Sequence, residues 1–212
     1  GYLQYNNSTN SIELQSGGSI RFQTGGTTDR MILDDNSKIS LANNDGGTGN
    51  TIFGRGTGGT VASGSNYNVL MGWDVANQGL NGGTFNVSIG TNSSRGLTSG
   101  DYNVAVGSNA LYAINTGSNN VAVGANALKT ATTALNNVFI GKGAGEDIAG
   151  AVALSSTIAI GFEAFKGSGS TSAAANGTLA IGSEALKVLT TGGSNTAVGY
   201  QSLMTLATGN NN

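Results

Sequence analysis

The chain has 212 residues, a formal net charge of −2 and 36 glycines, and it contains no Pro, Cys or His. Without Cys and His, the sequence lacks a thiolate nucleophile, a disulfide framework, a Cys- or His-ligated metal site and a Ser-His-Asp triad. Its nine basic residues are scattered, whereas nucleic-acid binding needs a clustered cationic face. No apolar run approaches the roughly 18 residues of a membrane span. The composition therefore excludes several enzyme classes and predicts neither nucleic-acid binding nor membrane insertion.

The first 45 residues have the pattern of short strands separated by Gly-Gly and Asp-Asn turns. Apolar residues alternate with polar ones in four places along this segment. We expect residues 1–45 to form a β-rich connector that precedes a different domain at 46–212. The alternating pairs are Ile12/Leu14, Ile20/Phe22, Met31/Leu33 and Ile39/Leu41.

A nine-residue unit recurs through residues 46–212, most clearly as NVAVGSNAL at Asn103–Leu111 and NVAVGANAL at Asn120–Leu128. Each of nine copies has one anchoring glycine, and successive anchoring glycines are 17 to 21 residues apart. A recurring period of this length is typical of a solenoid whose coils stack on one another. The anchoring glycines are Gly54, Gly72, Gly90, Gly107, Gly124, Gly141, Gly161, Gly182 and Gly199.

Apolar residues flank a small residue directly before the glycine, as in Val104-Ala105-Val106, and this alternation predicts a short strand. The glycine is expected where the backbone turns sharply or another segment approaches closely. Asn begins the strand in seven of the nine copies, so stacked coils place these amides where they can form a hydrogen-bonded ladder or cap a turn. The seven are Asn50, Asn68, Asn86, Asn103, Asn120, Asn137 and Asn195.

After the glycine, apolar residues three apart, such as Leu111 and Ile114, favour one helical turn. We expect each coil to contain a strand, a tight turn, a brief helical segment and a loop, with Ala and Val filling a thin interior. Such a coil encloses little volume, so we expect a symmetric homotrimer whose strands face a shared axis.

The predicted fold class is mainly β: an elongated trimeric β-solenoid of nine coils with short helical turns. One further step of 17 residues from Gly199 places Asn212 at the start of a tenth coil. We therefore expect the parent protein to continue beyond this residue.

Three glycine-rich or acidic segments could suggest a chemical site. The loop at 138–147 has Glu146 where a dinucleotide fingerprint needs its third glycine. The segment at 46–54 resembles a calcium-binding nonapeptide, but Thr51 occupies the position of the required Asp. The adjacent acids Asp34/Asp35 and Glu146/Asp147 are expected in turns, because neighbours on a strand point to opposite faces. We therefore predict no catalytic residue, no metal and no cofactor.

The position after the anchoring glycine holds Trp73, Phe162 and Tyr200, and mostly small or charged residues in the other copies. Such variability indicates an outward position. An exposed aromatic ring there is suited to stack on a sugar or to cover a neighbouring coil or chain. These three residues are the candidate glycan contacts.

The coil NVAVGSNAL resembles the head repeats of trimeric autotransporter adhesins, although the coils here are longer. Together with TGGTTDRMILDDNSKISL upstream, the chain resembles bacteriophage tail fibres, in which an intramolecular chaperone domain often follows such repeats. This resemblance implies a non-enzymatic, homotrimeric shaft of a virion tail fibre that joins adjoining fibre domains and binds a host-surface glycan or protein. Two alternatives remain: the head of an autotransporter on the bacterial cell surface, and the non-catalytic part of a polysaccharide-degrading tailspike.

Overall fold

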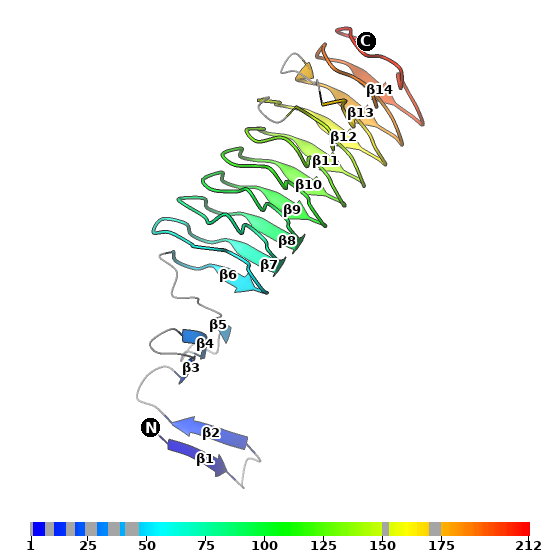
Figure 1. The fold of residues 1–212 in the computed structure, drawn as a ribbon. Helices are drawn as coiled ribbons and strands as arrows, with labels where there is room; N and C mark the ends of the chain where they lie inside the picture. Colours follow the sequence, from blue (N-terminus) through cyan, green and yellow to red (C-terminus); the bar gives the residue numbers. More distant parts are fainter. Residues whose placement is uncertain are drawn as a thin grey trace. The chain divides into compact units, whose positions relative to one another are not determined.

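The computed structural model describes residues 2–6, 11–15, 20–23, 29–33, 39–40, 47–149, 153–169 and 175–212 (Figure 1). Contacts between Cα atoms divide the chain into two units, Gly1–Asp45 and Gly46–Asn212. Each unit has its own sheets, because every strand pairs only with strands of the same unit.

The first unit contains two small antiparallel sheets. Strands β1 (Tyr2–Asn6) and β2 (Ser11–Gln15) form a pair. Strands β3 (Ile20–Gln23), β4 (Asp29–Leu33) and β5 (Ile39–Ser40) form a three-stranded sheet in chain order. Strands therefore occur at four places where the sequence alternates, and β1 is an additional one. Leu41 and the pair Asp34/Asp35 lie outside the described residues.

The second unit is a β-solenoid built on one parallel sheet of nine strands, which follow one another in chain order (Figure 1). Residues at the same place in successive coils are in register, so Val104 pairs with Val121 and Val121 with Val138. The predicted mainly β solenoid is confirmed. Its strands are β6 (Thr51–Phe53), β7 (Val69–Trp73), β8 (Val87–Thr91), β9 (Val104–Val106), β10 (Val121–Val123), β11 (Val138–Ile140), β12 (Ile158–Ile160), β13 (Leu179–Ile181) and β14 (Thr196–Val198).

Each anchoring glycine adopts a φ between 126° and 141°, a region that side chains with a Cβ rarely occupy. Space is also restricted at most of them. A Cβ built on Gly124 would lie 2.6 Å from the carbonyl carbon and oxygen of Gly141, one coil further on. Backbone conformation and the close approach of the next coil therefore both require glycine there.

The prediction of a helical turn after each glycine is wrong. Asn109 and Leu111 have φ values of 56° and 50°, and such left-handed residues cannot alternate within a right-handed helix. The reason lies in the stacking. The N–H of Asn109 donates to the preceding coil, at Thr91, and the N–H of Leu111 donates to the following coil, at Ala127. In these tight turns, residues with positive φ alternate with residues with negative φ, and their N–H groups therefore point toward both neighbouring coils. In a helix the same N–H groups would bond within the coil.

The predicted interior is wrong in one respect: the Val residues of the strands do not fill it. Ala105 at the centre of β9 is fully buried, whereas its neighbours Val104 and Val106 are only half-buried and belong to the outer face of the sheet. The interior forms between the strand centres and the turns, where Leu111 and Ile114 are fully buried. The central residue of these strands therefore faces inward, and in β9 it is a small one.

The strand centre and the residue four positions after the glycine face each other across this interior, and their sizes compensate. In the coil of β8 the two are Ser88 and Ser94, whose hydroxyls share a hydrogen bond of 2.8 Å. In the coil of β11, a Cβ on Gly145 would lie 2.5 Å from the ring of Phe139. Outside the coil of β8, where both residues are Ser, a large residue at one place thus accompanies a small one at the other. The residues at these two positions in the other coils are Ile52/Gly58, Leu70/Ala76, Ala105/Leu111, Ala122/Leu128, Ala159/Phe165, Ala180/Leu186 and Ala197/Leu203, of which Leu203 is exposed.

Candidate functional site

The asparagines that begin the strands form a buried amide ladder. Asn103 donates from Nδ2 to Oδ1 of Asn86 (3.1 Å) and to the carbonyl of Gly117 (2.8 Å), and its own Oδ1 accepts from Asn120. The ladder runs from Asn50 through Asn137 and connects Asn195 with Asn212. All of these amides except the two end members, Asn50 and Asn212, are buried, so they stabilise the stack and do not form a ligand surface.

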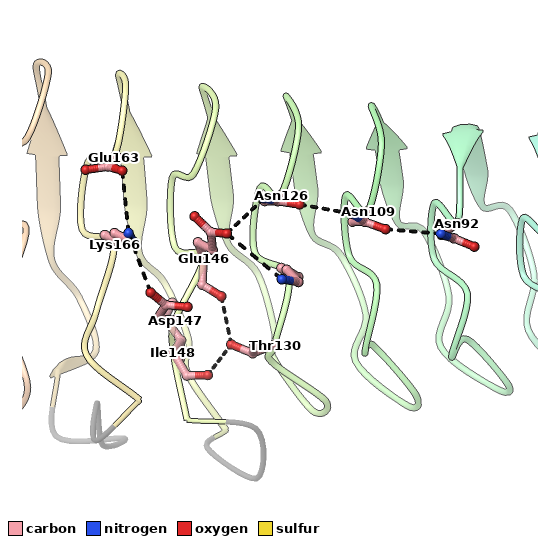
Figure 2. A network of polar contacts seen from close by, with 10 residues as sticks. Asn92, Asn109, Asn126, Thr130, Glu146, Asp147, Ile148, Glu163 and Lys166 are labelled. Carbon is pink, nitrogen blue, oxygen red and sulfur yellow. Dashed lines mark hydrogen bonds and ion pairs between the residues drawn. The ribbon is translucent and has the colours of Figure 1, made fainter.

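A second polar ladder follows the turns on the surface. Asn92 donates to Asn109 over 3.3 Å, Asn109 to Asn126 over 3.1 Å, and Asn126 to the carboxylate of Glu146 over 2.8 Å (Figure 2). Each bond joins one coil to the next. The side chain of Glu146 therefore ends a row of amides.

The adjacent acids Glu146 and Asp147 contact different coils. Glu146 contacts Asn126 and Lys129 of the preceding coil, the latter over 4.0 Å, whereas Asp147 lies 3.7 Å from Lys166 of the following coil (Figure 2). Each carboxylate thus belongs to a separate inter-coil contact. They do not face each other across a cleft, as the two acids of a glycosidase do.

An ion-pair network continues along the turns of the last coils. Nζ of Lys187 lies 2.7 Å from Glu163 and 2.6 Å from Glu184, which also accepts a hydrogen bond from Gln201. The hydrogen bond from Lys187 lowers the pKa of Glu163, and bonds from Gln201 and Lys187 lower the pKa of Glu184. The two carboxylates raise the pKa of Lys187 above its ordinary value. These contacts join neighbouring coils.

The three aromatic residues that the sequence singles out are exposed, by 55% for Trp73, 46% for Phe162 and 74% for Tyr200. They occupy the same position in their coils, but five strand spacings, roughly 24 Å, separate Trp73 from Phe162. Arg55 lies over the Trp73 ring, with its guanidinium carbon 5.9 Å from the ring centroid. Trp73 therefore lies apart from the other two rings, whereas Phe162 and Tyr200 are two strand spacings, roughly 10 Å, from each other.

A row of stacked aromatic rings that we did not predict lies on the early coils. Tyr67, Phe85 and Tyr102 stack in sequence, with centroids 5.1 and 5.0 Å apart, and all three are exposed. Each directly precedes the asparagine that begins a strand. The repeated aromatic-Asn dipeptide is a signal for this row, because equivalent positions of adjacent coils lie next to each other.

The outer face of the parallel sheet carries two apolar rows, one on each side of the buried strand centres. Several members are exposed, including Phe53, Met71, Ile140, Ile158 and Val198. One row is Thr51, Val69, Val87, Val104, Val121, Val138, Ile158, Leu179 and Thr196, and the other is Phe53, Met71, Ile89, Val106, Val123, Ile140, Ile160, Ile181 and Val198. We call these two rows the outer sheet face.

A polar groove of about 530 Å³ lies among the turns of the coils of β7 to β10. No sequence motif marks this groove, because its residues come from four coils. Its lining includes Gln78, Arg95, Tyr112, Asn115, Thr116 and Thr133.

In the described part of the chain, no three His, Cys, Asp or Glu side chains are grouped so that they could hold a metal ion. None of the helices among the described residues is long and apolar enough to cross a membrane. In comparisons with known proteins, no family model, curated protein or solved structure matches this chain.

Proposed function

We propose that this chain is the non-enzymatic shaft of a bacteriophage tail fibre, that it assembles as a homotrimer through the outer sheet face, and that it attaches the virion to a bacterial surface. The single observation that carries the proposal is the apolar outer sheet face on a nine-coil solenoid. The resemblance of the coils and of the upstream segment to tail fibres supplies the biological setting.

The outer sheet face argues for a partner because parallel sheets are ordinarily covered on both sides. Here the inner side faces the turns, and the outer side presents two rows in which only Thr51 and Thr196 are polar. A contiguous exposed apolar surface of this kind marks an interface. Three copies around an axis would each bury the same face, in keeping with the closed symmetry of most homo-oligomers.

Such an assembly suits attachment. Three identical chains present every surface feature three times, so that weak contacts combine into strong overall binding. In the proposed assembly the exposed rings of Trp73, Phe162 and Tyr200 are contacts for host glycans. Because most of the polar groups described above bond to neighbouring coils, we assign the solenoid a mechanical and binding role without catalysis.

Sedimentation equilibrium of the full chain tests the assembly. We expect three times the chain mass of 21.0 kDa. A Val106→Asp/Val123→Asp variant, which places two charges on the outer sheet face, should sediment as a monomer and keep its β signal in circular dichroism. Ser108→Asp, on an exposed residue beside the sheet, is the matched control and should remain trimeric.

Binding of the labelled protein to bacterial cells tests attachment. We expect saturable binding to the cells of at least one host and much weaker binding by the monomeric variant. A wild-type monomer would overturn the assembly, and absence of binding across a broad bacterial panel would reduce the protein to a spacer. Release of oligosaccharides from capsular polysaccharide would instead favour an enzyme.

A further inference from the structure

The polar groove has the chemistry of a saccharide site. Its volume of about 530 Å³ lies within the range of small-molecule sites. Gln78, Asn115, Thr116 and Thr133 are among its lining residues, and they carry amide and hydroxyl groups. These groups both donate and accept hydrogen bonds, as the hydroxyls of a sugar require.

Arg95 gives the groove a charge. Its guanidinium donates a 3.1 Å hydrogen bond to the hydroxyl of Tyr112 and lies over that ring, 5.7 Å from the centroid. Tyr112 occupies the equivalent position in the next coil, so the two side chains fix each other. One face of the guanidinium therefore covers the ring, while its remaining N–H groups bond to no side chain in the described part of the chain and can meet a ligand.

Arg95 differs from the other cations at its position in the coil. Lys129 lies 4.0 Å from Glu146, Lys166 lies 3.5 Å from Glu163, and Lys187 contacts two carboxylates. No carboxylate of the described residues lies within 4.0 Å of Arg95, although its side chain is half-buried. A guanidinium held in a groove without an acidic partner is suited to bind a carboxylate from outside.

We propose that this groove binds a carboxylate-bearing sugar of an acidic bacterial polysaccharide. Arg95 pairs with the sugar carboxylate, Tyr112 holds the guanidinium in place, and the surrounding amides and hydroxyls bond the sugar hydroxyls. This site deepens the proposed function and rests on it for the biological role. The groove lies on the turns, away from the strand residues of the outer sheet face. The proposed trimer would therefore carry three accessible copies of it.

The test uses the full chain and immobilised oligosaccharides of galacturonate, glucuronate and sialic acid, each beside its carboxyl methyl ester. Esterification removes the charge and retains the sugar hydroxyls. We expect at least one acid to bind about ten-fold or more tightly than its ester, as a charged hydrogen-bonded pair implies. Arg95→Gln should abolish this difference and leave the unfolding temperature unchanged within a few degrees.

Lys142→Gln is the matched control, because it removes one exposed positive charge outside the groove. It should preserve the preference for the acid. Equal binding of acid and ester, no binding of any acid, or equal losses from Arg95→Gln and Lys142→Gln would overturn the site. Binding of poly-glutamate as tight as that of the best sugar would overturn the assignment to a glycan. If Arg95→Gln binds host cells as the wild type does, this site is rejected and the proposed function stands.

Discussion

Oδ1 of Asn86 accepts two hydrogen bonds from Asn103, one from its backbone N–H (2.9 Å) and one from its Nδ2 (3.1 Å). Replacing Asn103 with Ala removes the side-chain bonds on both sides. The buried carbonyl of Gly117 and the N–H of Asn120 then lose the partners described above, at about 1–3 kcal/mol each. We expect Asn103→Ala to lower the free energy of unfolding by about 2–6 kcal/mol in urea denaturation.

Asn103→Thr is the informative comparison, since Thr157 and Thr178 occupy this position in two natural coils. Thr178 bonds locally, to the carbonyl of Ala175. The loss from Asn103→Thr should therefore be smaller. Equal losses from the two substitutions would argue that volume, and not hydrogen bonding, decides stability at this position.

Substitutions at two anchoring glycines distinguish the cost of backbone strain from the cost of the close approach of the next coil. Gly124 and Gly199 have φ values of 130° and 126°, but a Cβ on Gly199 would meet no atom within 4 Å. Ala at Gly199 should cost about 1–3 kcal/mol for strain alone. Ala at Gly124 should cost more, because the Gly141 backbone must also move. Thermal unfolding of both variants measures the difference in stability. Equal losses of stability would show that the close approach of the next coil contributes no additional cost.

The large and the small residue that face each other inside the solenoid should be exchangeable between the strand and the turn. Phe139→Ala should cost about 3–5 kcal/mol, because Gly145 opposite cannot fill the cavity. Gly145→Leu alone should also destabilise, since the Phe139 ring occupies its space. The double variant recreates the arrangement of Ala122 and Leu128 and should recover much of the loss. It should not recover all of it, because Phe139 also stacks on Phe165, 6.3 Å away.

A double-mutant cycle on these two positions measures the coupling from urea unfolding. We expect the double variant to be more stable than Phe139→Ala. Additive losses would show that the two side chains do not share one space.

The ion pairs of Lys187 predict a pH dependence with a defined sign. The pKa values of Glu163 and Glu184 lie below 4.5, so their contribution is present above that pH and is lost as pH falls through the lowered values. The pKa of Lys187 lies above 10.5, so its contribution is present below that pH and is lost as pH rises through the raised value. Stability from this network should be constant between these limits.

Lys187→Gln should weaken the acid-induced fall in unfolding temperature, measured from about pH 7 to about pH 3, the range over which these carboxylates become protonated. Lys142→Gln, at an exposed lysine outside the described ion pairs, should keep the wild-type profile. The network is surface-exposed, so about 0.5 M salt should reduce the difference between wild type and Lys187→Gln. Identical profiles for all three proteins at low salt would contradict this assignment.

The solenoid could be predicted from the sequence because identical coils must place identical residues in register. The spacing from Gly107 to Gly124 and the Val104-Ala105-Val106 alternation are sufficient for the strand and its stacking. The alternation alone does not say which side faces inward. Val104 and Val106 are expected inside because they are apolar, whereas the turn supplies Leu111 and leaves room only for Ala105.

The conformation of the turn could not be predicted from the sequence pattern. Leu111 and Ile114 have a helical spacing, but the positive φ of Leu111 is imposed by bonds to other coils, which local propensity does not contain. The groove is likewise hidden, because Arg95 and Tyr112 are 17 residues apart and become neighbours only through stacking. The aromatic row of Tyr67, Phe85 and Tyr102 obeys the same rule and could be predicted from it.

The constant register of the parallel sheet has an evolutionary consequence. Duplicating the 17 residues from Gly107 to Val123 would add one coil whose neighbours already exist in the stack. Each such duplication would lengthen the solenoid by about 4.8 Å without requiring a new kind of contact. Selection can therefore adjust the length of the solenoid in small, equal increments, while the contacts between coils stay the same.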